Sequence, residues 1–582
     1  PNEQRRIDLL IRAKKGIRNI TVLNILIKRN VIEDHHLRFN EDFIYYSDLP
    51  FVEGLVMYGN KIAFDEETLY AKRKHNDPIN TPALSQIKDE TKFDEFINVY
   101  KYAISLVDRE SRIRYYLDSK MIKYYSNYFA KKIRRSKNDF WRDERFDQMT
   151  LLMKNVRDDL LKNMSRYQQK MVKLSRNHDL SGTQKVIARH LAKSKLKKML
   201  KNKNEVNKYL YRHKYLEEPI EENWVMFETF MGKSYADSPK YIYEYLAKNY
   251  PGKYKFIWVL NDPKEKLPYE GIIVKRFTKK YAYYLAKSKY FVFNIRQPLW
   301  FRKREGQVFL ETWHGTPLKR LAFDQEEVTA ASPTYKAQFY RQKQEWDYLI
   351  AANKFSSDIF KSCFMYTNGT MLEIGYPRND LLYAPNKDEI ALELKKKLHI
   401  PLDKKTILYA PTWRDDEYYG KGKYKFKLKL DLEMMKKELG DDYVILLRTH
   451  HYIADSLDVT GVEDFAINLS KYDDITEIYL ISDICITDYS SVFFDFANLK
   501  RPMLFYTYDI DKYRDVLRGF YIDMEKELPG PLVYSTNEVI EQIKNIDEMT
   551  QKYAQRYEEF YQRFCSIDDG QASKRACEAV FK

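Results

Sequence analysis

Long apolar runs are absent from this sequence of 582 residues. No stretch approaches the roughly 20 apolar residues that a membrane-spanning helix needs, and no signal peptide is recognisable. Glycine and proline are sparse, with 18 and 19 residues, which argues against a disordered or low-complexity chain. The chain begins at Pro1 rather than at a methionine, so we expect an N-terminally truncated protein.

Cysteine is scarce, and several familiar motifs are missing. The four cysteines, Cys363, Cys485, Cys565 and Cys577, have no metal-ligand spacing, so we expect reduced thiols. The sequence has no Walker-type glycine-rich loop, no GxGxxG, no HExxH and no nucleophile elbow. These absences argue against a P-loop NTPase, a dinucleotide oxidoreductase, a zinc protease and a serine hydrolase.

Positive charge, in contrast, is abundant and concentrated. The chain carries a net charge of +16. The segment from Lys101 to Lys214 contains 31 Lys and Arg against 11 Asp and Glu, a net of +20, so the rest of the chain carries −4. A localised excess of this size predicts a polyanionic partner, which is a nucleic acid, an anionic membrane or a phosphate polymer.

Residues 86–218 are predicted to form this basic helical region, because glycine and proline almost disappear there. The expected helices are Thr91–Leu106, Arg109–Arg135, Arg142–Arg176 and Gly182–Arg212. The stretch Lys185–Lys214 has 11 basic residues and one acid, with apolar residues at roughly helical spacing, which favours membrane association. The alternative is a solvated helix packed on its own domain. Nucleic acid is less favoured, since no zinc-finger, RRM or helix-turn-helix signature is present.

From Glu222 onward, short apolar runs alternate with helical patterns. WVMFETF, KFIWVL and QVFLETWHGTP read as strands, and a second set begins near Lys404 with TILYAPTW, YVILLRTH and ICITDYSS. Such alternation predicts two doubly wound domains with parallel sheets, spanning residues 219–385 and 386–582. Ligands of these folds bind beyond the carboxyl ends of the strands, so the polar residues that follow the strands are the candidates for chemistry. The length alone also requires several domains.

His314 is the first candidate, in the segment ETWHGTPLKR after the strand QVFL. Gly315 permits close backbone approach and Pro317 fixes the exit from the loop. An imidazole at a strand end can act as a general base at neutral pH. The alternative, a hydrogen-bonded structural histidine, is outweighed here by this context.

His450 ends the strand YVILLRTH, two residues after Arg448. A cation and an imidazole at a strand end suit the phosphates of a nucleotide donor, although a structural pair is an equal alternative on the residues alone. His451 is expected to point to the opposite face of the strand.

Hydroxyl and carboxyl groups follow two further strands. Thr487–Ser491, TDYSS, leads into a helix, where hydroxyls and amides can bind an anion, unless they serve only as an ordinary cap. In the segment APTWRDDEYYGKGKY, Arg414 can contact phosphate or base and the acids Asp415 and Asp416 can hold sugar hydroxyls, or they are solvated loop charges.

From Trp224 to Cys577, the chain resembles the CDP-glycerol:poly(glycerophosphate) glycerophosphotransferases, the teichoic acid polymerases of Gram-positive bacteria. The resemblance rests on FETFMGKSYADSPKYIYEYL, ETWHGTPLKRLAFD, EIGYPRNDLL, YAPTWRDDEYYGKGKYKF, DDYVILLRTH, ITDYSSVFFDFANLKRPMLFYTYDIDKYRDVLRGFY and LPGPLVY. One departure is His451, where we expect a tyrosine.

The resemblance implies a GT-B-like pair of Rossmann-type domains, with the acceptor on residues 219–385 and CDP-glycerol on residues 386–582. It implies that the basic helical region binds the cytoplasmic face of the cell membrane as a peripheral element. Residues 1–85 look like the C-terminal remnant of a GT-A-like, family 2 glycosyltransferase domain. The implied catalytic residues are His314 and His450. The implied donor-binding residues are Arg414, Asp415, Arg448, Thr487, Asp488, Ser490 and Ser491, and Gly315, Thr316 and Lys319 would support the acceptor loop.

The activity implied by this resemblance is transfer of glycerol phosphate from CDP-glycerol to a lipid-linked poly(glycerol phosphate) acceptor, with release of CMP. Alternatives are a ribitol-phosphate polymerase, a single-unit primase, a nucleotide-sugar glycosyltransferase of the GT-B fold, or a non-catalytic protein that binds phosphate polymers or membranes. No acidic cluster demands a metal and the sequence makes no cofactor certain, while assistance by Mg²⁺ and a homo-oligomeric state stay open.

Overall fold

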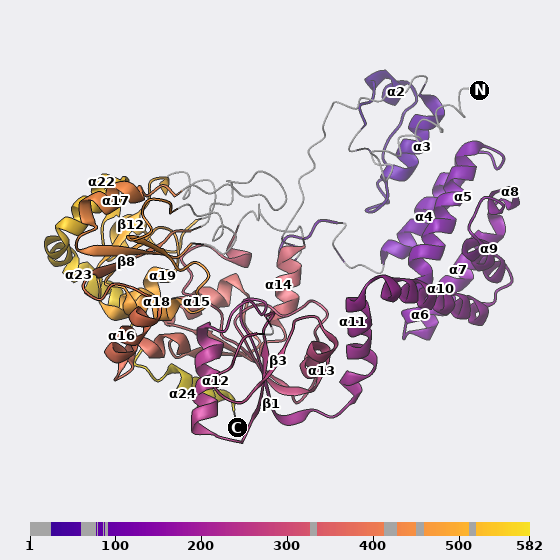
Figure 1. The fold of residues 1–582 in the computed structure, drawn as a ribbon. Helices are drawn as coiled ribbons and strands as arrows, with labels where there is room; N and C mark the ends of the chain where they lie inside the picture. The colour runs from indigo at the N-terminus through magenta and orange to yellow at the C-terminus, as the bar shows by residue number, and fades with distance from the viewer. Residues whose placement is uncertain are drawn as a thin grey trace. The chain divides into compact units, whose positions relative to one another are not determined.

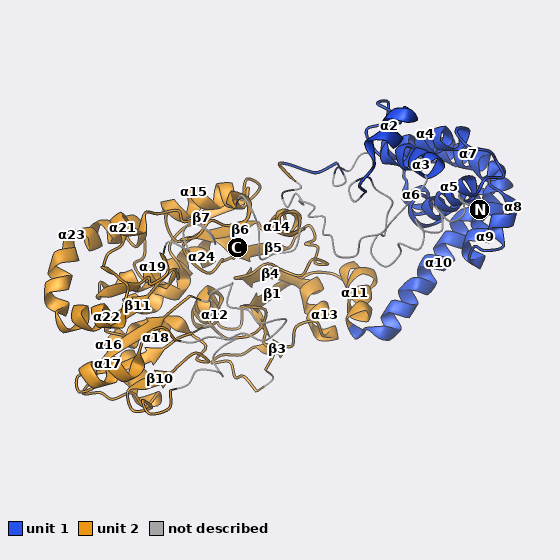
Figure 2. Cartoon of the chain, turned by 90° about the horizontal axis from the view of Figure 1, so that it is seen from above, with its two compact units in different colours: residues 1–75, 81–203 blue, residues 76–80, 204–582 orange. Residues whose placement is uncertain are grey.

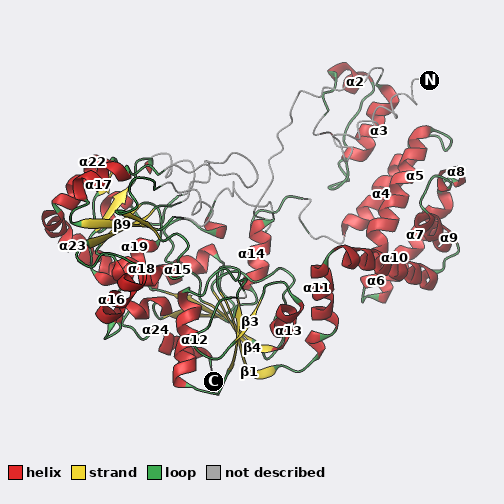
Figure 3. Cartoon of the chain, in the orientation of Figure 1, coloured by secondary structure: helices red, strands yellow, loops and turns green. Residues whose placement is uncertain are grey.

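The computed structural model describes residue 22 and residues 25–59, 77, 79–84, 87, 91–262, 264–325, 334–412, 428–449, 459–510 and 519–581. The chain forms two compact units, residues 1–75 with 81–203 and residues 76–80 with 204–582 (Figure 2). In the described parts of the chain, every strand belongs to the second unit (Figure 3).

The first unit is built from helices around one apolar core. That core includes Phe93, Met121, Phe129, Met149 and Met171, all buried. Its elements are α2 (Arg29–Asp34), α3 (Asp48–Tyr58), α4 (Thr91–Ser105), α5 (Arg112–Tyr124), the π-helix η3 (Tyr125–Phe129), α6 (Ala130–Arg135), α7 (Asp139–Asn155), α8 (Asp158–Leu161), α9 (Arg166–Arg176) and α10 (Leu180–Lys201).

Two of the predicted helices are divided in the structure. The helix predicted over Arg142–Arg176 is three helices, because the backbone becomes extended at Val156 and α9 starts afresh at Ser165. Ser165 forms a capping box with Gln168, which stops a helix from running through it. The helix predicted over Gly182–Arg212 is α10 followed by α11 (Lys203–His213), since Asn202 is also extended.

The second unit begins with a seven-stranded parallel sheet of order β3-β2-β1-β4-β5-β6-β7. Its strands are almost continuously apolar and buried, as expected when helices cover both faces. They are β1 (Glu221–Glu228), β2 (Lys255–Val259), β3 (Ile272–Val274), β4 (Ser288–Phe293), β5 (Val308–Glu311), β6 (Tyr348–Ala351) and β7 (Thr370–Glu373). The accompanying helices are η4 (Tyr215–Glu217), α12 (Asp237–Asn249), α13 (Lys279–Lys287), η5 (Ala322–Asp324), α14 (Tyr335–Lys343), α15 (Lys354–Cys363) and η6 (Pro377–Tyr383).

A six-stranded parallel sheet of order β10-β9-β8-β11-β12-β13 follows. Its strands are β8 (Lys405–Ala410), β9 (Tyr443–Leu447), β10 (Ala466–Asn468), β11 (Ile484–Thr487), β12 (Met503–Tyr506) and β13 (Leu532–Val533). Its helices are α16 (Lys387–Lys397), α17 (Leu432–Leu439), α18 (Ile475–Ile481), α19 (Val492–Phe496), η7 (Ala497–Leu499), α21 (Met524–Glu527), α22 (Thr536–Lys544) and α23 (Ile546–Phe564).

The last helix returns to the first sheet. In Figure 1, α24 (Ala572–Val580) lies beside α12, although it follows the second sheet in the chain. Its residues Cys577 and Val580 share an apolar core with Val225 and Phe227 of β1. The predicted pair of parallel sheets is thus confirmed.

Candidate functional site

Asn294 joins three elements at the point where the strand order of the first sheet reverses, between β1 and β4. It directly follows β4, and its Oδ1 accepts a hydrogen bond from Phe230 N, at the end of β1, over 3.0 Å. Its Nδ2 donates to Asp237 Oδ2, at the start of α12, over 2.7 Å. Because ligands of parallel α/β sheets bind at such switch points, this edge is the place to look for a site.

The backbone around this edge is strained. Phe230, Asp237 and Trp313 adopt left-handed φ values of 44°, 62° and 52°. Bulky residues rarely adopt this conformation because it costs energy. Residues with such strained backbones tend to cluster at functional sites. The hydrogen bonds of Asn294 to Phe230 and Asp237 hold two of these strained residues in place.

His314 lies in the loop after β5, and one contact defines its tautomer. Its Nδ1 lies 2.8 Å from the carbonyl oxygen of Asn294. Since a carbonyl can only accept, Nδ1 carries the proton and Nε2 keeps its lone pair. The ring stacks on Trp313 at 4.3 Å between centroids and meets Phe230 edge-on at 6.2 Å. His314 is therefore oriented with a basic nitrogen unused by these contacts.

Desolvation by the surrounding protein lowers the pKa of His314 from its ordinary 6.5, against the opposing effects of the Asn294 hydrogen bond and the charge of Asp237. His314 is nevertheless exposed to solvent. The two observations agree if protein encloses most of the ring and leaves one approach open. A pKa below 6.5 keeps the imidazole neutral at neutral pH.

Gly315 brings the His314 loop against the second sheet. A Cβ atom at Gly315 would lie 2.9 Å from Ser491 Oγ, closer than real Cβ contacts, and 3.9 Å from Arg378 Nη2. The two predicted segments HGTP and TDYSS therefore meet, although they are far apart in the sequence. Any side chain at Gly315 would displace the Ser491 hydroxyl.

The TDYSS segment follows β11, where the order of the second sheet reverses between β8 and β11. Thr487 Oγ1 donates to the carbonyl of Ala410 over 2.7 Å, and Asp488 Oδ1 accepts from Thr412 N over 2.7 Å. The side chains of Thr487 and Asp488 are buried in these links between strands. The half-buried Ser490 and Ser491 are the hydroxyls of this segment left nearest the surface.

Arg448 adds a positive charge beyond β9. Its Nη1 donates to the carbonyls of Leu469 and Ser470 over 3.0 and 2.8 Å, and desolvation lowers its pKa. It forms no ion pair with a carboxylate of the described residues. The predicted residues His450, His451, Arg414 and Asp415 lie outside the described residues, so their roles stay predictions.

The two remaining predicted loop residues are Thr316 and Lys319. Thr316 is buried, and Lys319 forms an antiparallel bridge with Phe520. Beside this bridge, Arg320 N donates to Gly519 O over 2.9 Å. The chain that leaves the HGTP turn is thus joined by backbone bonds to the second sheet's domain.

Arg378 was missed by sequence reasoning, although it lies in the quoted segment EIGYPRNDLL. Its Nη1 donates to Asp237 Oδ1 and its Nη2 to Asp495 Oδ2, both over 2.8 Å. All three side chains are buried. Arg378 connects the start of α12 with α19, and only contacts between distant segments reveal this. Asn294 was missed too; the signal available was a polar residue closing the apolar run YFVF.

Comparison with known proteins gives a family for the part of the chain that contains both sheets. The profile of the CDP-glycerol:poly(glycerophosphate) glycerophosphotransferase family matches residues 209–582. The chain belongs to this family.

Similar members of this glycerophosphotransferase family carry names from teichoic acid synthesis. The chain is 39% identical to a teichoic acid poly(glycerol phosphate) polymerase of Staphylococcus epidermidis over 97% of this chain and 79% of that protein. It is 43% identical to a teichoic acid glycerol-phosphate transferase of Staphylococcus aureus over 62% of this chain and 93% of that protein. A structure of the wall teichoic acid polymerase TagF matches with a TM-score of 0.63 and 46% identity, covering 67% of this chain and 95% of that one. A histidine-to-asparagine variant of TagF soaked with CDPG matches equally well in TM-score.

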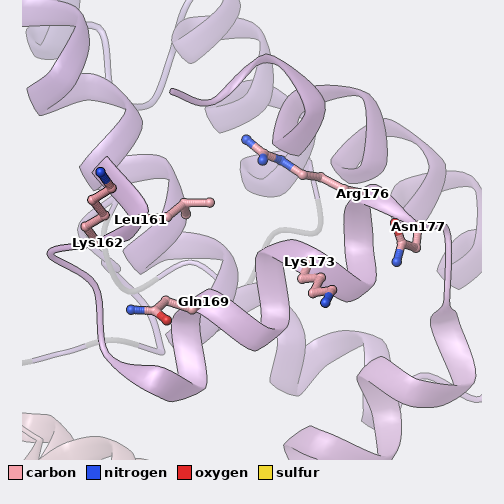
Figure 4. A pocket seen from close by; sticks show the side chains of 6 residues that line it. All are labelled: Leu161, Lys162, Gln169, Lys173, Arg176 and Asn177. Carbon is pink, nitrogen blue, oxygen red and sulfur yellow. The ribbon is translucent and has the colours of Figure 1, made fainter. Parts of the chain in front are cut away.

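A separate recess lies in the helical unit, away from these loops in the sequence. It encloses about 380 Å³ and is lined by Leu161, Lys162, Gln169, Lys173, Arg176 and Asn177 (Figure 4). Lys162 follows α8, whereas the other polar residues lie on or next to α9. The lining is cationic and contains no acid.

Proposed function

We propose that this protein extends a teichoic acid chain by transferring glycerol phosphate from CDP-glycerol to the terminal hydroxyl of a membrane-linked poly(glycerol phosphate), releasing CMP. The observation that most directly supports this proposal is the close approach of Gly315 to Ser491. It sets a neutral, oriented imidazole beside the hydroxyl-bearing loop of the second sheet. The acceptor would bind the domain of residues 219–385, and CDP-glycerol the domain of residues 386–582.

The proposed chemistry is a direct phosphoryl transfer. The acceptor oxygen attacks the β-phosphorus of CDP-glycerol while its proton passes to His314 Nε2. The bond from that phosphorus to the bridging oxygen breaks, and the electron pair leaves with CMP. Arg448, Ser490, Ser491 and, by its place in the sequence, His450 would stabilise the charge on the phosphate oxygens. Such transfers depend mainly on positioning and electrostatics.

Sequence similarity favours glycerol over ribitol. Identity is 39% and 46% to two poly(glycerol phosphate) polymerases, but 26% to a poly(ribitol-phosphate) polymerase and 28% to a glycerol-phosphate primase. We therefore propose CDP-glycerol as the donor and polymerisation rather than single addition as the reaction.

We also propose that the helical unit binds an anionic membrane surface, as a peripheral protein on the cytoplasmic face. On α10, Leu196 and Leu200 are 57% and 81% exposed among lysines, and apolar groups set in positive charge suit an anionic bilayer surface. The cationic recess of Figure 4, with Lys162 and Lys173, would suit phosphate headgroups. In the described residues, no helix is long and apolar enough to cross a membrane.

The deciding experiment measures CMP release from CDP-glycerol with a lipid-linked glycerol phosphate primer, and the length of the product. We expect release that depends on the primer and a product many units long. CDP-ribitol and a UDP-sugar serve as competing donors. Faster transfer from either competitor, or binding of the primer without CMP release, would contradict the proposal.

A further inference from the structure

Arg296 lies beside the candidate base and is not used by the mechanism above. It follows Asn294 by two residues in the loop after β4. Its guanidinium lies 5.0 Å from the ring centroid of Tyr335 and 4.8 Å from that of Phe339, both on α14. Phe339 in turn contacts Trp313, the ring on which the base stacks, at 6.3 Å. Arg296 and the base thus share one cluster of aromatic rings.

The position of this guanidinium is fixed by a chain of amide contacts. Arg296 Nη1 donates to Gln342 Oε1 over 3.3 Å. Gln342 is itself paired with Gln297, whose Nε2 donates to the Gln342 carbonyl over 2.7 Å, and Trp346 Nε1 donates to Gln297 Oε1 over 3.1 Å. Tyr335, Phe339 and Gln342 lie on one face of α14 by their spacing. The arginine is therefore held before any ligand arrives.

Arg296 forms no ion pair with a carboxylate among the described residues. Glu311 acts electrostatically on Arg296, but burial raises the pKa of Glu311 well above its ordinary range and so favours its neutral form. The carboxylate of Asp237 is bound by Arg378 and Asn294. Desolvation lowers the pKa of Arg296, yet a guanidinium stays charged in proteins. A fixed cation next to a base calls for an anionic ligand.

We propose that Arg296 binds the acceptor's phosphodiester that lies one glycerol unit behind the attacking hydroxyl. This inference rests on the proposed function and adds to it a residue that recognises the acceptor. The rings of Tyr335 and Phe339 lie 5.0 and 4.8 Å from the guanidinium and 6.0 Å from each other, so both pack on the same side of it. Nη1 binds Gln342, and the planar fork of donors on a guanidinium suits two phosphate oxygens.

The donor phosphates have the same chemistry, but they are the less suitable occupant. Every hydrogen bond and ring contact given above for Arg296 lies in the first sheet's domain. The groups assigned to the donor, Ser491 and Arg448, belong to the second. An acceptor phosphate bound at Arg296 would hold the terminal hydroxyl near His314, which is how remote binding energy is converted into orientation.

The test compares Arg296→Gln and Arg296→Lys with the wild-type full chain in CMP release. We expect Arg296→Gln to raise the KM for the lipid-linked glycerol phosphate primer about 10- to 100-fold, as for loss of charge-assisted hydrogen bonds. The KM for CDP-glycerol should stay within about twofold, because the donor is bound elsewhere. Arg296→Lys should recover part of the lost primer affinity, since lysine restores the charge but not the planar pair of N–H donors of a guanidinium.

A matched control is Arg302→Gln, in the same loop. Arg302 has a 48% exposed side chain and lies 3.7 Å from Glu345, so its loss should leave both KM values unchanged. A second measurement needs no turnover: calorimetric binding of a soluble glycerol phosphate oligomer whose terminal hydroxyl is methylated. Wild type and Arg302→Gln should bind it alike, and Arg296→Gln should bind it at least about tenfold more weakly.

Three outcomes decide the matter. Unchanged oligomer affinity in Arg296→Gln overturns the inference, and so does a rise in the KM for CDP-glycerol with no change for the primer. A wild-type chain that binds the oligomer through Arg296 but releases no CMP would reject the proposed function and keep the binding site. Melting curves of each variant show whether a loss comes from unfolding.

Discussion

His314 owes its tautomer to a backbone group rather than to a carboxylate. The Asn294 carbonyl receives the Nδ1 proton at 2.8 Å, and the strained residue Trp313 supplies the stacking surface. No carboxylate has to be placed behind the imidazole to select its tautomer. The ring is kept neutral by desolvation instead, which is a common way to prepare a base.

Replacing His314 by alanine should lower turnover by about 10²- to 10⁴-fold, the usual contribution of a general base. Binding of CDP-glycerol should remain measurable, because the residue belongs to the acceptor side. CMP release and calorimetric titration with CDP-glycerol check the two parts. Normal polymer synthesis by His314→Ala would contradict its role as the base.

The pH dependence of kcat/KM follows from the same residue. A base works only when unprotonated, and the pKa of His314 is lowered from 6.5. Activity should therefore fall as the pH drops through a midpoint below 6.5, and the imidazole should be fully active at neutral pH. An acid-side midpoint above 6.5 in a pH–rate profile would show that a different group, or a protonated His314, controls the reaction.

Helix α10 has a partly buried first half and an exposed second half. Thr183 and Ile187 are buried near its start, whereas Leu196 and Leu200 are exposed near its end. A helix that only supported its own unit would bury its apolar residues along its whole length. This exposure supports the proposal that the helical unit binds a membrane surface.

Charge reversal on the exposed half of α10 should weaken vesicle binding. We expect the triple variant Lys193→Glu, Lys197→Glu and Lys201→Glu to lose at least about tenfold in affinity for phosphatidylglycerol-containing vesicles, at about 1 kcal/mol for each lysine near an anionic surface. The control is Lys396→Glu with Lys397→Glu at the end of α16, which should bind as the wild type does. Equal vesicle affinity in cosedimentation for all three proteins would reject the membrane role.

Across the two-sheet unit, buried polar contacts join the two domains on several sides. Arg378 pairs with Asp237 and Asp495, and Lys240 of α12 pairs with Asp474 beside α18 at 2.7 Å. The backbone bridge at Lys319 adds a third connection. Because these contacts join the two domains, they hold the base loop and the proposed donor loop in position relative to each other.

Removing the guanidinium of Arg378 should destabilise the fold, because it leaves Asp237 and Asp495 as buried, unpaired carboxylates. We expect Arg378→Met to lower the free energy of unfolding by about 3–5 kcal/mol, as for a broken buried pair. The exposed pair of Lys500 and Glu558 offers the comparison, and Lys500→Met should cost less than about 1 kcal/mol. Denaturant titrations measure both, and equal small losses would show that the Arg378 contacts are not structural.

Much of this architecture follows from local sequence. The alternation of apolar runs and helical patterns predicted both parallel sheets, and the position of His314 after QVFL predicted its place at a strand end. The break before α9 had a readable signal too, because Ser165 and Gln168 have capping-box spacing. It was missed because no glycine or proline marks the break.

The sequence by itself determined which elements form and which residues close them, because hydrophobic period and strand-end chemistry are local properties. Only the tertiary structure decided that Asn294 orients His314, because a backbone carbonyl leaves no trace in residue identity. It alone also decided that Gly315 meets Ser491 and that Arg378 is shared between Asp237 and Asp495, because these partners are brought together by chain packing over long sequence separations.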